Sequence, residues 1–151
     1  MTIVFILIVV FTGSLIALQG VVNAYLGQQI GNPLQAGLIS FGLGFFVLLV
    51  LVLLQRAPFS VTQLANTPKI ALIGGLLGCV YVVSVIYIVP KVGIASTVIA
   101  ALCGQIILSV IMDHFGFLNL QVSRISVSKV LGVGFVLVGV VLVNLQKFQQ
   151  S

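Results

Sequence analysis

Residues 3–26 read IVFILIVVFTGSLIALQGVVNAYL, and residues 34–54 read LQAGLISFGLGFFVLLVLVLL. Neither stretch contains a charged side chain. Each is long enough to cross the hydrocarbon core of a bilayer, which takes about 20 apolar residues in a helix. A helix satisfies its own backbone hydrogen bonds in lipid, so both stretches are predicted to be transmembrane helices.

The rest of the chain has the same character. Of its 151 residues, 61% are hydrophobic and 5% are charged, against about 25% charged in an ordinary soluble domain. The mean hydropathy is +1.39. We therefore predict an all-α integral membrane protein, in which residues 1–151 form a single five-helix transmembrane domain with helices at about residues 3–26, 34–54, 70–89, 92–112 and 126–145. The first segment has no basic stretch before its apolar run and is expected to be retained, unlike a signal peptide.

Two prolines mark predicted helix ends. Asn32 is expected to cap the helix that Pro33 begins, because proline at the first helical position loses no hydrogen bond. Pro90 is expected to stop the helix over residues 70–89.

The basic residues lie singly near the predicted helix ends. Five spans place four of them on the side of the N-terminus and two on the other: Arg56, Lys69, Arg124 and Lys129 against Lys91 and Lys147. This margin favours a cytoplasmic N-terminus and is small enough to leave insertion in both senses open. Because no basic cluster forms, a nucleic-acid partner is not expected, and the bilayer itself is the expected surrounding.

No catalytic or cofactor-binding combination of residues is evident in the sequence. Cys79 and Cys103 lie in predicted spans, away from any Cys or His at ligand spacing, and the chain has one histidine, so no metal site is expected. No phosphate loop or dinucleotide fingerprint appears. We expect neither an enzyme nor a cofactor.

Small residues recur four apart in two of the predicted helices. Ser96, Ala100 and Gly104 form one such series, and Gly74 and Gly78 form another. Such faces let two helix backbones approach closely in lipid, so these residues are predicted to be helix interfaces.

Uncharged polar side chains inside the spans are candidates for a solute path. They are Thr12, Gln19 and Asn23 in the first helix, and Gln105 and Ser109 in the fourth. Two interpretations stay open, namely hydrogen bonds between helices and the lining of a cavity. The two carboxamides on the first helix favour the cavity.

Asp113 is the only acidic residue, and it stands beside His114 where the fourth helix is expected to meet the membrane surface. One interpretation is a surface salt bridge with Arg124 or Lys129. The other is a titrating pair that couples transport to protons or ions. An acid at mid-membrane, which proton-driven exporters of organic cations need as a counter-charge, is not expected in this chain.

Two stretches resemble the YdcZ-like family of the drug/metabolite transporter superfamily: Gln19, Asn23, Leu26, Gly31, Asn32, Pro33, Ala36, Ser40, Phe41 and Gly44, and then Gly104, Gln105, Ser109, Asp113, His114, Phe115 and Gly116. The glycine-rich final helix, residues 129–143, adds to the resemblance. It implies a five-helix half-transporter of the bacterial inner membrane. Two such units inserted in opposite senses would form an inverted-repeat, ten-helix dimer.

The sequence thus predicts a multi-pass transporter of a small molecule that acts by alternating access, and the resemblance implies that it is an exporter. Its partner would be a second, antiparallel copy or a homologous subunit. Gln19, Asn23 and Gln105 would line the path. The alternative is a non-transporting subunit that uses its small-residue faces to stabilise a larger membrane complex.

Overall fold

A computed structural model describes residues 2–56, 60–119 and 121–148. Within these ranges five helices are long and apolar enough to cross a membrane, as predicted. They are α1 (Thr2–Ile30), α2 (Pro33–Leu54), α4 (Gly74–Val92), α5 (Ile94–Phe115) and α6 (Val127–Phe148), with a short helix α3 (Val61–Asn66) and the 3-10 turns η1 (Lys69–Leu72) and η2 (Phe117–Asn119) in the connections. Most of their side chains are apolar and exposed, which suits lipid as the surrounding solvent.

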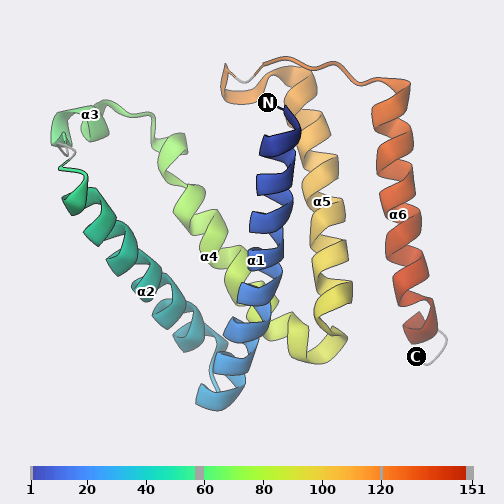
Figure 1. The fold of residues 1–151 in the computed structure, drawn as a ribbon, viewed down its shortest axis with the longest axis horizontal. Coiled ribbons are helices and arrows are strands. Elements are labelled where there is room, and N and C mark those ends of the chain that lie inside the picture. The colour runs from blue at the N-terminus through green and yellow to red at the C-terminus, as the bar shows by residue number, and fades with distance from the viewer. Residues whose placement is uncertain (1, 57–59, 120, 149–151) are drawn as a thin grey trace. The chain divides into compact units, whose positions relative to one another are not determined.

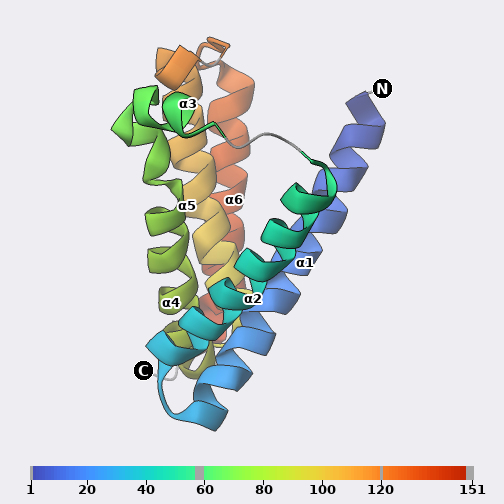
Figure 2. The same cartoon turned by 90° about the vertical axis from the view of Figure 1, so that its left-hand side faces the viewer.

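The chain divides into two compact units, Met1–Lys91 and Val92–Ser151. In the first unit, α1 and α2 form a helical hairpin (Figure 2). The turn is built as predicted: Asn32 Oδ1 accepts hydrogen bonds from the N–H groups of Leu34 at 2.9 Å and Gln35 at 3.3 Å, and Pro33 takes the first helical position. Gly31 has φ +75°, a conformation that glycine adopts without strain.

The buried part of the first unit lies near this turn. On α1 the buried residues follow a helical stripe: Gly20, Asn23, Ala24 and Gly27. On α2 they are Ala36 and Gly37, and on α4 they are Val85 and Ile86. The small residues of the hairpin make room for the branched side chains of α4.

Ile86 is the largest side chain in this buried part, with 2% of its surface exposed. Its Cγ2 atom lies 2.6 Å from the point where a Cβ on Gly27 would stand. Val83 Cγ2 lies 3.1 Å from the corresponding point on Gly37. Glycine at both positions therefore permits the close approach of α4 to the hairpin.

The prediction that Pro90 ends its helix is wrong, because α4 continues through Pro90 to Val92. Proline removes one hydrogen bond, and in a last turn little of the helix depends on that bond. The helical register places Lys91 one turn after Tyr87, with the Lys91 Nζ 3.6 Å from the centre of the Tyr87 ring. The helix ends instead at Gly93, whose φ of 81° and ψ of 158° are accessible essentially to glycine alone.

In the second unit, α5 and α6 run side by side in opposite directions (Figure 1). Helix α5 ends at Gly116, which is left-handed with φ 61° and donates its N–H to Met112 O. This is the usual glycine cap of a helix C-terminus. Residues 116–126 then connect the two helices at one end of the pair.

Candidate functional site

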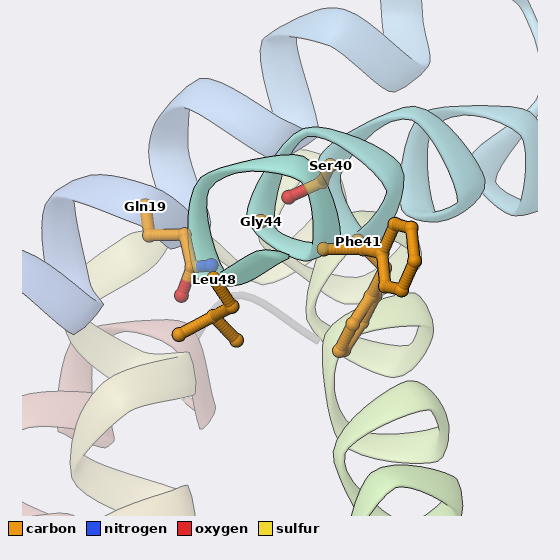
Figure 3. Close-up of a pocket in the computed structure, with 6 residues that line it drawn as sticks. Gln19, Ser40, Phe41, Gly44 and Leu48 are labelled. Carbon is orange, nitrogen blue, oxygen red and sulfur yellow. The ribbon is translucent and has the colours of Figure 1, made fainter. Parts of the chain in front are cut away.

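A cavity of about 370 Å³ lies against α1 and α2 of the first unit (Figure 3). Its size falls within the range of small-molecule sites. Six residues line it: Gln19 from α1, and Ser40, Phe41, Gly44, Phe45 and Leu48 from α2. One predicted path residue, Gln19, is therefore a cavity residue.

The Gln19 carboxamide projects from α1 toward Leu48 of α2 (Figure 3). Ser40, one turn before Gly44 on α2, adds a hydroxyl to the same cavity. A carboxamide and a hydroxyl both donate and accept hydrogen bonds and carry no charge. The remaining lining is aromatic or aliphatic, so the cavity suits a small, uncharged solute with a hydrogen-bonding group.

Asn23 lies one helical turn from Gln19, on the buried stripe of α1, with 6% of its surface exposed. Its side chain makes no hydrogen bond to another residue in the described part of the chain. None of the described side-chain nitrogen or oxygen atoms is both fully buried and unpartnered, so the Asn23 amide keeps some accessible surface. A carboxamide in apolar surroundings with no hydrogen bonds of its own gains free energy when a solute donates or accepts a hydrogen bond there.

Two predicted path residues use their hydroxyls within their own helices. Thr12 Oγ1 donates to Ile8 O at 3.0 Å, and Ser109 Oγ donates to Ile106 O at 2.9 Å. Such bonds satisfy a hydroxyl in lipid without a second helix. Gln105 is exposed on α5, one turn before Ser109.

The predicted interface residues have different surroundings. Gly78 lies against the Phe41 ring, whose Cζ is 3.6 Å from the point where a Cβ would stand, whereas Gly74 has open space around it. In the second unit Ser96 is buried, and Ala100 and Gly104 are exposed. In the described structure, the close approach of helices in the first unit depends on Gly27 and Gly37, which the fourfold spacing did not single out.

Asp113 and His114 fasten the connection between α5 and α6. Lys129 Nζ lies 3.4 Å from Asp113 Oδ2 and donates at 3.0 Å to both the carbonyl oxygen and the Oγ of Ser123. The Ser123 N–H donates to Asp113 O at 2.9 Å, and the Ile125 N–H donates to His114 Nδ1 at 3.3 Å. Of the two interpretations of Asp113, the salt bridge is thus present, and its partner is Lys129.

The aromatic lining of the cavity was missed by sequence reasoning. Phe41, Phe45 and Leu48 stand at helical spacing on α2, and Gly44 between them leaves room beside the helix. That spacing was visible in the sequence. However, α2 is apolar on every side, so its pattern does not tell which face meets α1.

Residues 4–142 match the family described as "Putative inner membrane exporter, YdcZ", and the chain belongs to this family. The resemblance drawn from the sequence is therefore confirmed. The five apolar helices and the family membership support a multi-pass protein of the inner membrane. Five such helices are compatible with a transporter. No match was found among curated proteins or among solved structures.

Proposed function

We propose that this member of the YdcZ family exports small, uncharged solutes that are held by the cavity between α1 and α2. The observation that carries the proposal is the pairing of the Gln19 carboxamide with an aromatic and aliphatic wall on α2. An amide can hold one polar group of the solute while the wall takes its apolar part. A carboxylate, which a cation would need as a counter-charge, is not among the residues that line this cavity.

The proposed path continues from Gln19 to Asn23, one turn nearer the hairpin end. Asn23 offers an amide whose hydrogen bonds are unmade within the described chain. A solute leaving Gln19 would find a second amide at the next turn of the same helix. We further propose that Gln105 of α5 contributes a third.

The proposed working form is an antiparallel pair. Five spans would leave the two ends of the chain on opposite sides of the membrane, and two copies of the chain in opposite orientations would then create a two-fold axis in the membrane plane. Alternating access would rock one copy against the other, with the solute held near the centre of the bilayer. More basic residues are expected on the membrane side that carries the N-terminus than on the other side, and this excess favours a cytoplasmic N-terminus in the majority orientation.

Transport is tested with the full chain in proteoliposomes loaded with a panel of small aromatic amides and alcohols, matched to charged analogues. We expect faster efflux of at least one uncharged member than from protein-free vesicles, because the cavity offers hydrogen bonds and no counter-charge. The charged analogues should leave at the protein-free rate. Efflux of charged analogues alone, or of none, would contradict the proposed function.

The antiparallel pair is tested by C-terminal reporters, one active only in the cytoplasm and one only outside it. We expect activity from both, because the small charge bias allows both insertions. Activity from one reporter alone would rule out a self-sufficient antiparallel homodimer. It would direct attention to an oppositely oriented homologous partner or to the subunit alternative.

A further inference from the structure

A second cavity, of about 330 Å³, lies between α5 and α6 and is lined only by apolar residues. Its lining includes Ile107 and Ile111 of α5, Ile125 just before α6, and Val130, Gly134 and Leu137 of α6. These residues belong to the last turns of α5 and the first turns of α6. The cavity therefore lies near the end of the pair at which residues 116–126 form the connection.

Of the two basic residues near this end, Lys129 and Arg124, one has an acidic partner and the other has none in the described part of the chain. Lys129 is paired with Asp113, as described above. Arg124, the neighbour of the cavity residue Ile125, is exposed and makes no ion pair or hydrogen bond within the described part of the chain. One unpaired basic residue thus directly precedes, in the sequence, a residue that lines the apolar cavity.

We propose that this cavity binds an anionic phospholipid, with an acyl chain between α5 and α6 and the headgroup phosphate on Arg124. A guanidinium matches a phosphate with two parallel hydrogen bonds, and hydrocarbon matches the apolar lining. Basic groups beside cavities between transmembrane helices are suited to anionic headgroups on the cytoplasmic side. This site shares no residue with the cavity of the first unit.

Charge complementarity selects a lipid over a second copy of the chain as the occupant. A protein partner would have to offer Arg124 a carboxylate. The chain has one acidic residue, Asp113, and it is already paired with Lys129. A second copy therefore has no free acid to offer, whereas an anionic lipid carries its charge next to its acyl chains.

The site is tested by native mass spectrometry of the full chain, equilibrated in detergent with phosphatidylglycerol or with phosphatidylcholine of the same acyl chains. The wild type should retain phosphatidylglycerol in preference. Arg124→Gln should lower this preference about fivefold, the effect of one basic side chain at an anionic surface. Arg56→Gln is the matched control, since Arg56 is also exposed and the charge count places it on the same membrane side.

The acyl-chain part is tested by Gly134→Leu, which places a side chain in the cavity and should lower retention of both lipids. Gly132→Leu is its control, because both glycines lie on α6 with open space at the Cβ position and Gly132 does not line the cavity. The Arg124→Gln arm does not depend on how α6 tolerates leucine.

Three outcomes would overturn the proposal. Equal effects of Arg124→Gln and Arg56→Gln would show a diffuse attraction without a site. Displacement of phosphatidylglycerol by excess inorganic phosphate, with no effect of Gly134→Leu, would show a phosphate site without an acyl chain. A change of oligomeric state in Gly134→Leu with unchanged lipid retention would show that the cavity receives a second copy.

Discussion

The Gln19→Leu variant should lose transport of the solute that the wild type exports, with affinity falling roughly tenfold to hundredfold. Leucine is of similar length, so the cavity beside α2 keeps its shape while the carboxamide is lost. The polar group of the solute then enters an apolar cavity with one partner fewer, and an unsatisfied polar group is costly there. The measurement is efflux from proteoliposomes across a range of solute concentrations.

The control for this prediction is Gln28→Leu, which removes the same group from an exposed position on the same helix outside the cavity. Transport by the Gln28→Leu variant should match that of the wild type. Undiminished transport by Gln19→Leu would remove Gln19 from the path. Gln105→Leu in the same assay tests whether the second unit contributes an amide.

The Gly27→Val variant should fold poorly or lose about 1–3 kcal/mol of stability. Its Cβ would stand 2.6 Å from Ile86 Cγ2, too close for real contacts, and Ile86 is almost fully buried and has little space into which to move. The clash would push α4 away from the hairpin of α1 and α2. The yield of monodisperse protein in mild detergent and its midpoint of thermal unfolding are the measurements.

Gly13→Val is the matched control, because Gly13 lies on the same helix and a Cβ there meets nothing within 4 Å. The two variants carry the same change in helix propensity, so a difference between them reports packing. Adding Ile86→Ala to Gly27→Val should recover part of the loss, since the two side chains compete for one space. Equal stability of the two valine variants would mean that α4 does not approach Gly27.

The turn at Asn32 and Pro33 was predictable because its hydrogen bonds join residues two and three apart in the sequence. The extension of α4 past Pro90 was not. The end of that helix depends on the conformation of Gly93, three residues further on, and a glycine permits many conformations before the surrounding chain selects one.

The ion-pair partner of Asp113 was also only partly predictable from the sequence. The sequence offered Arg124 and Lys129 as equal alternatives, and both lie within reach along the chain. The position of Ser123 decided between them, because Ser123 lies at the end of α5, where its two oxygens and Asp113 together receive the Lys129 ammonium. Arg124 is left unpaired in the described chain and becomes available to another anion.

By itself the sequence determined the five apolar helices and the membership of the YdcZ family, because hydrophobicity and length decide the solvent of each segment locally. It also identified Gln19 and Asn23 as polar groups of the first helix. Only the tertiary structure decided that Gln19 lines a cavity with Phe41 and Leu48 and that Ile86 fills the space left by Gly27. The physical reason is that a membrane helix is apolar on every side, so its sequence pattern does not show which face contacts another helix. That face is selected by the fit of side chains between the packed helices.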